Sequence, residues 1–263
     1  MPRSVRRSWL LLAALALAPA CAHQGGAPAS AGEQQALPSA DELIARSITA
    51  QGGEAALRAH RAVRMTGTFS MAAQGIQGQM TLWATAEGQM YSRVQIEGIG
   101  TMEEGVDGAL VWSKDPLAGP RLKTGVEATQ AKRAADFYLA LDLPTHYPTR
   151  ETVRQTLLDG VPVWEVRLVP AEGPEEIAWF DTQSGLELGT KMTLQTAMGD
   201  VTVTSTNQDF RAAGGVTLPF QTSMKNSLMT STITWTEIVW DPADLGMPAV
   251  PDDVRALAPT GVP

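Results

Sequence analysis

The sequence predicts a mainly β protein of the α+β class, in which a curled antiparallel sheet of about a dozen strands forms a half-open barrel. Three observations predict this fold. From Ala62 onward, apolar and polar residues alternate with the period of two that is typical of strands with one buried face. Turn signals such as Asp159-Gly160 and Gly214-Gly215 separate these runs. Because so long a sheet must curl to bury a face, we expect N-terminal helices and one inserted helix to close its open side.

The first 20 residues have the order of a bacterial signal peptide. Three arginines precede an apolar stretch, residues 9–18, which is too short to span a bilayer. Small residues then lead into Cys21 in a lipobox-like pattern, although Pro19 departs from its commonest form. We therefore expect Cys21 to carry a lipid anchor of several acyl chains, palmitate among them. The alternative is an ordinary secretory signal that leaves Cys21 as a free thiol.

Composition limits the partners. Cys21 is the lone cysteine, so the mature domain forms no internal disulfide and must rely on its core. Without the signal peptide the chain keeps 17 basic and 28 acidic residues, a net charge of about −11. This charge argues against binding to nucleic acid or, through charge, to anionic lipid headgroups.

Residues 21–38 are rich in Ala, Gly, Pro, Ser and Gln, which predicts a flexible tether. Ala22 follows the cysteine where some bacteria place an aspartate to retain lipoproteins at the inner membrane. By that analogy we expect the outer membrane, with the domain facing the periplasm.

The folded domain is expected to span residues 39–241, before a Pro-rich C-terminal extension over 242–263 with a short helical turn at 252–257. Residues 39–42 form a capping-box-like helix start, and Leu43, Ile44 and Ile48 follow at helical spacing. Gly52-Gly53 ends this helix, and a second short helix covers 54–60.

Twelve runs have strand patterns, and two other segments interrupt them. We expect a loop at 114–121, which carries two prolines and a glycine, and an internal helix at 126–141, closed by Pro144 and Pro148. The expected strands are 62–71, 76–85, 90–97, 100–105, 109–113, 152–158, 161–169, 176–180, 186–196, 200–210, 216–224 and 227–240.

Several stretches in this order resemble the LolA/LolB superfamily of periplasmic lipoprotein carriers and receptors. They are Thr81-Leu82-Trp83, the hairpin from Gly105 to Trp112, Asp115-Pro116-Leu117, Ala178-Trp179-Phe180-Asp181 with Ser184-Gly185-Leu186, and the run from Gly214 to Phe220. The resemblance covers residues 41–241 and implies a half-barrel that holds acyl chains in an apolar cavity between sheet and helices. The soluble carriers of that superfamily are not lipidated, so this chain resembles more closely its anchored receptors or anchored lipid-binding relatives.

Methionine is abundant in the expected strands and suits surfaces that accept variable apolar ligands. The alternative is ordinary core filling, and a register slip of one residue would exchange the two faces of any strand. The residues expected to face a ligand cavity are Met65, Phe69, Ile76, Met80, Leu82, Met90, Val94, Ile96, Met192, Leu194, Leu218, Phe220, Met224, Ile233 and Trp235.

Signals for catalysis are poor. The sequence has no His-Glu-x-x-His motif, no Gly-x-Ser-x-Gly elbow and no phosphate-binding loop. The neighbouring acids at 103–104, 175–176 and 252–253 are interpreted as solvated charges. We expect no metal, no cofactor and no catalytic residue, although carboxylates distant in sequence could still form an acid pair.

Two main hypotheses follow. In the first, the protein binds a lipid or the acyl chains of a lipoprotein without covalent chemistry, as a carrier, receptor or sensor in the cell envelope. In the second, the same fold is an accessory or regulatory module that binds another envelope protein. An enzyme is the third and weakest hypothesis.

Overall fold

The computed structural model describes residues 36–196 and 199–258 of the chain. The predicted signal peptide and Cys21 lie outside the described residues, as do nearly all of the predicted tether and residues 259–263 of the C-terminal extension. No helix within the described ranges is long and apolar enough to cross a bilayer.

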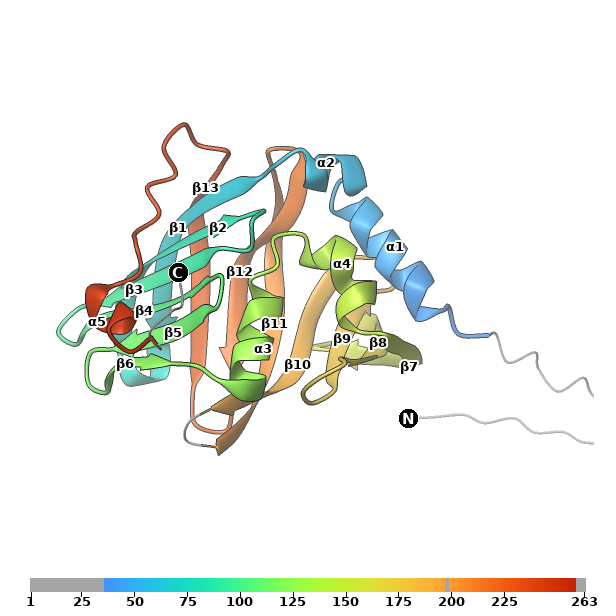
Figure 1. Ribbon diagram of the computed structural model, residues 1–263. Coiled ribbons are helices and arrows are strands. Elements are labelled where there is room, and N and C mark those ends of the chain that lie inside the picture. Colours follow the sequence, from blue (N-terminus) through green and yellow to red (C-terminus); the bar gives the residue numbers. More distant parts are fainter. Residues whose placement is uncertain (1–35, 197–198, 259–263) are drawn as a thin grey trace, which may run out of the picture. The chain divides into compact units, whose positions relative to one another are not determined.

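The strands of the described chain form one 13-stranded antiparallel sheet (Figure 1). Its order is β6-β5-β4-β3-β2-β1-β13-β12-β11-β10-β9-β8-β7, so the first and last strands pair in the interior while β6 and β7 form two open edges. The predicted half-open sheet is therefore confirmed. In chain order the strands are β1 (Ala62–Met71), β2 (Ile76–Thr85), β3 (Met90–Ile96), β4 (Gly100–Asp107), β5 (Leu110–Asp115), β6 (Gly119–Leu122), β7 (Thr149–Leu158), β8 (Val161–Val169), β9 (Glu176–Asp181), β10 (Glu187–Thr196), β11 (Gly199–Ala213), β12 (Val216–Lys225) and β13 (Thr230–Trp240).

The contacts of one helix show how strongly the sheet curls. Helix α3 (Gly125–Ala134) contacts both β5 and β10, which are far apart in the strand order. Only a curled sheet can bring two such strands to the same helix. Figure 1 shows α3 and the following α4 (Leu139–His146) on the side toward which the sheet curls.

The central strand β1 shows why the chain forms this sheet. Its inward residues Val63, Met65 and Gly67 are buried, whereas the last part of the strand is less covered. Gly67 lies beside a register shift between β1 and β13, where a Cβ atom would come within 2.3 Å of the Thr234 carbonyl oxygen. The close approach of β13 therefore requires glycine at this position.

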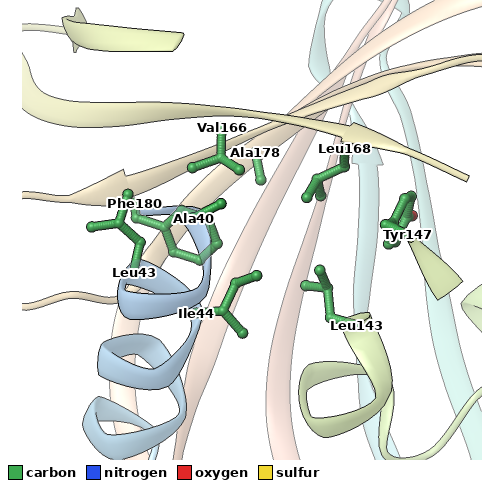
Figure 2. Packing of buried hydrophobic residues seen from close by; sticks show 9 residues of the cluster. All are labelled: Ala40, Leu43, Ile44, Leu143, Tyr147, Val166, Leu168, Ala178 and Phe180. Carbon is green, nitrogen blue, oxygen red and sulfur yellow. The ribbon is translucent and has the colours of Figure 1, made fainter. Parts of the chain in front are cut away.

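Helix α1 (Ala40–Ala50) begins with the predicted capping box. The Glu42 N–H donates to Ser39 Oγ over 3.2 Å, and the Ser39 N–H donates to the Glu42 carboxylate over 2.7 Å. Leu43 and Ile44 are buried in a cluster with residues of β8, β9 and α4 (Figure 2). The packing of Leu43 and Ile44 thus fixes α1 over one half of the sheet. The short helix α2 (Glu54–Arg58) follows and leads into β1.

The inserted helical segment differs from the prediction. One helix was expected at 126–141, but the structure has two, because the chain breaks between α3 and α4. Asp136 makes the break: its carboxylate accepts the Tyr138 N–H at 2.9 Å and contacts His146 Nε2 at 2.6 Å. Pro144 was expected to close the segment, yet it lies inside α4.

A second difference concerns the expected loop at 114–121. Its first residues extend β5, and its last residues form the additional strand β6. Pro120 is tolerated there because β6 is an edge strand, where a missing N–H breaks no pairing on the open side. The turn between β5 and β6 is built by Asp115, whose carboxylate accepts the N–H groups of Leu117 and Ala118.

Beyond β13 the chain packs on an aromatic cluster of β2, β3 and β5. Val250 and Val254, the latter in the short helix α5 (Asp252–Arg255), are buried against Trp83, Tyr91 and Trp112. Cross-strand pairing puts Tyr91 opposite Trp83, and Met90 is its neighbour in the chain. Adjacent strand residues face opposite ways, so this cluster and Met90 lie on different faces of the sheet.

Candidate ligand cavity

A cavity of about 660 Å³ lies between the inner face of the sheet and the helices α3 and α4. This volume is typical of small-molecule sites. Strands β3 to β6 line one side and β8 to β12 the other, and the helices form a roof. The surface of the cavity is mainly apolar, although polar and charged residues also line it. Its apolar side chains are Met90, Val106, Ala131, Ala134, Leu139, Ala140, Leu143, Leu168, Leu186, Met192, Leu194, Phe210 and Pro219.

Strand alternation positions the apolar lining. On one side Met90 pairs with Val106, so both side chains point to the same face. On the other side Met192 and Leu194 are two residues apart in β10 and therefore share a face. From the roof, Leu143 lines the cavity and also belongs to the buried cluster that contains Leu43 and Ile44 of α1 (Figure 2).

Three ion pairs line the cavity. Arg121 of β6 forms two bonds to Glu127 of α3, at 2.5 and 2.8 Å, and Lys123 lies 2.7 Å from Glu104 of β4. Arg133 of α3 bonds the buried Glu176 of β9 at 2.7 Å. Two of the pairs join α3 to opposite halves of the sheet, so they hold the roof across the opening.

The Arg133–Glu176 pair is the most enclosed of the three, because both side chains are 7% exposed. The Tyr147 hydroxyl donates to the same carboxylate at 2.9 Å, and the guanidinium lies 5.0 Å from the centre of the Tyr147 ring. Burial and the nearby Glu176 charge raise the pKa of Tyr147, so this hydroxyl stays protonated and remains a donor.

Gln130 joins the roof to the sheet by a different interaction. Its side-chain Nε2 donates to the Thr193 carbonyl at 2.8 Å, and its Oε1 accepts the Gln195 N–H at 3.1 Å. Strand β9 pairs with β10 only as far as Lys191, so the Thr193 carbonyl and the Gln195 N–H have no partner in β9. The Gln130 amide takes the place of the missing strand neighbour.

Glu187, at the start of β10, also lines the cavity. Its backbone carbonyl accepts a hydrogen bond from the Asn207 side chain, but its carboxylate has no hydrogen bond or ion pair among the described residues. Burial and the Glu176 charge raise the pKa of Glu187 to about 7. The carboxyl group therefore titrates near neutrality.

The predicted cavity residues separate into three sets. Met90, Met192 and Leu194 line the cavity. Nine others pack in one cluster along the middle of the sheet with Phe137, which follows α3: Met65, Phe69, Met80, Leu82, Leu218, Phe220, Met224, Ile233 and Trp235. Ile76, Val94 and Ile96 belong to neither set, and Ile96 is buried. Contact of any of the fifteen residues with a ligand stays a prediction.

The polar part of the cavity was missed from the sequence. Glu176 was interpreted as a solvated charge beside Glu175, but it is buried and paired, while Glu175 is exposed. The available signal was its position at the start of an apolar strand, two residues before Ala178. Nothing in the sequence near Arg133 indicated that it is buried in an ion pair, because its partner Glu176 is distant in sequence.

No protein-family model matches the chain, and no curated protein is significantly similar to it in sequence. Solved structures do match its shape. A DUF1329 family protein from Desulfovibrio piger has a TM-score of 0.51 at 9% identity, covering 77% of this chain and 93% of its own. A LolA superfamily protein from Nitrosomonas europaea has a TM-score of 0.50 at 12% identity, covering 83% of this chain and 97% of its own.

The chain has a LolA-like fold. The predicted resemblance is thus confirmed at the level of the fold. In this LolA-like fold the described residues contain no group of three or more His, Cys, Asp or Glu that could hold a metal ion.

Proposed function

We propose that this protein is a lipid-anchored protein of the bacterial envelope that holds the acyl chain of a lipid or a lipoprotein in its cavity. The observation that carries the proposal is the apolar lining of the cavity beneath α3 and α4. Binding is non-covalent, and the role is that of a carrier, receptor or sensor facing the periplasm.

The size of the hydrophobic effect supports an acyl ligand. Each buried methylene is worth roughly 0.8 kcal/mol, so a chain of about 14 methylenes gains roughly 11 kcal/mol before the costs of association. Met90 and Met192 lie on opposite sides of the cavity, and flexible thioethers adapt to chains of different shape.

Native mass spectrometry tests the proposal. The full chain with Cys21→Ser, which cannot be lipidated, is purified without detergent, and any bound molecule is extracted and identified. We expect phospholipid or acylated peptide to accompany the protein, and we expect Met192→Asp to reduce the bound fraction. Lys191→Asp is the matched control, because Lys191 is exposed and does not line the cavity.

A protein that is free of ligand, and stays so after incubation with lipids, would contradict the proposal. A stoichiometric protein partner in place of lipid would then favour the accessory-module hypothesis. The anchor is tested separately on the unaltered chain: the mass of its N-terminal peptide should show acyl chains on Cys21, and a peptide with a free thiol would refute the anchor.

A further inference from the structure

The charges that line the cavity do not balance. Its three cationic side chains are Arg121, Lys123 and Arg133, and each is paired with a carboxylate as described above. Glu187 is the fourth carboxylate of the lining and has no cation within the described part of the chain. The cavity lining therefore carries one uncompensated acidic group.

The structure holds Glu187 in this position. It lies at a register shift between β9 and β10, and the Asn207 amide is bonded to its backbone carbonyl at 3.3 Å. These contacts fix the backbone and leave the carboxyl group to the cavity. An unpaired carboxylate in an apolar enclosure is unfavourable, and a ligand that supplies a positive charge would remove the penalty.

Resting on the proposed function, we propose that the ligand is an amphiphile whose polar end carries a protonated amine, and that this ammonium group pairs with Glu187 while the acyl chain fills the apolar part of the cavity. A fatty-acid carboxylate is disfavoured, because it finds no unpaired cation in the described lining and is repelled by Glu187.

The neighbouring titratable groups support this assignment. Glu176 of β9, Arg133 of α3 and Tyr147 after α4 are bonded to one another. The pKa of Glu187 at about 7 shows that its own ionisation is suppressed without a partner, through burial and the Glu176 charge. An ammonium group would favour the ionised carboxylate, so amine binding should strengthen from pH 6 to pH 8.

Three probes with the same chain length test the inference: dodecylamine, dodecanol and dodecanoate, each below its solubility limit and any critical micelle concentration. Binding to the full chain with Cys21→Ser is measured by calorimetry at pH 6 and pH 8. At pH 8 we expect dodecylamine to bind roughly tenfold or more tightly than dodecanol, as a charge-assisted hydrogen bond would give, and dodecanoate most weakly. Glu187→Gln should abolish the amine preference and its pH dependence while leaving dodecanol binding unchanged.

The matched control is Glu237→Gln, which removes the same charge from an exposed position on β13 outside the cavity. It should keep the order of the three probes. Equal binding of all three, tightest binding of dodecanoate, or an amine preference that survives Glu187→Gln would overturn the inference and leave the proposed function intact. If none of the probes binds, the proposed function itself fails.

Discussion

At the scale of single residues, the cavity combines an apolar lining with charges that are nearly all paired. Arg133, Glu176 and Tyr147 form the most enclosed group, in which one carboxylate accepts from both a guanidinium and a hydroxyl. Such a pair is costly to break, because removing one partner leaves the other charge buried. Glu187 is the exception, and its ionisation is therefore the most sensitive to what enters the cavity.

Arg133→Met should destabilise the protein by about 3 to 5 kcal/mol, since it leaves the Glu176 carboxylate buried without its cation. Urea unfolding at pH 7 measures the change. The control is Arg58→Met, which breaks an exposed pair with Glu54 and should leave the stability nearly unchanged. Similar losses of unfolding free energy in both variants would show that the buried pair contributes no more to stability than the exposed pair.

The titration of Glu187 should make the empty protein less stable as pH rises. Its pKa is about 7 in the folded state and 4.5 ordinarily, so between these values the unfolded chain ionises first. The free energy of unfolding should therefore fall by roughly 3 kcal/mol between pH 4.5 and pH 7 on account of this group. Measuring the free energy of unfolding of Glu187→Gln and of the parent protein at pH 5 and pH 8 isolates the effect. If the difference between the two proteins is the same at both pH values, the prediction is wrong.

At the scale of elements, α3 is attached to the sheet both by apolar packing and by polar side chains. Ala128 and Ala131 pack against a buried cluster that contains Val106 and Val111. Helix α3 bonds β6 through Arg121–Glu127, β9 through Arg133–Glu176 and β10 through Gln130. These bonds reach both halves of the curled sheet. These polar side chains therefore add specific attachments of α3 across the cavity to its apolar packing.

Gln130→Leu should loosen α3 from β10. It leaves the Thr193 carbonyl and the Gln195 N–H without their partner and should cost about 1 to 3 kcal/mol. Hydrogen exchange should quicken at Gln195, whereas Lys132→Ala, on the exposed side of α3, should leave it unchanged. Unaltered protection at Gln195 in the first variant would show that Gln130 does not support the strand.

A second attachment joins the start of the first strand, β1, to the end of the last strand, β13, in the interior of the sheet. The Asp241 carboxylate accepts the N–H groups of Arg61 and Ala62 and contacts His60 Nδ1 at 2.8 Å. Although burial works to raise the pKa of Asp241, these hydrogen bonds lower it below its ordinary value.

This contribution to stability is present above the ordinary pKa of an aspartate and should be lost as pH falls through the lower folded-state value. Asp241→Asn should therefore destabilise the protein at pH 7 and less so at strongly acidic pH. Thermal melting across this range measures the effect. A destabilisation that is independent of pH would contradict the role of the charge.

At the scale of the whole molecule, the fold follows from sequence because its main signals are local. The alternation of apolar and polar residues predicted most strands, and the pair Ser39 and Glu42 predicted the start of α1. The break at Asp136 was missed because it depends on contacts with Tyr138 and His146 rather than on a glycine or proline. Strand β6 was missed because Pro120 resembles a loop residue unless the edge of the sheet is known.

The site was less predictable, because its walls come together only through the curl of the sheet. Alternation indicated which residues share a face, but not which part of that face the roof leaves hollow. Phe137, in the unforeseen break between α3 and α4, packs against the middle of the sheet. Much of the predicted cavity face therefore lies in that cluster, while Leu139 and Leu143 of α4 supply lining that the strand pattern could not reveal.

The most direct test of the central claim is photolabelling with a long-chain alcohol that carries a diazirine, followed by peptide mapping. A neutral probe makes the result independent of Glu187. Bound between sheet and roof, it should label residues 125–147 and 186–196, which line the cavity from opposite sides. Labelling confined to exposed apolar tips, such as Leu117 and Leu228, would contradict the account and place acyl chains outside the cavity.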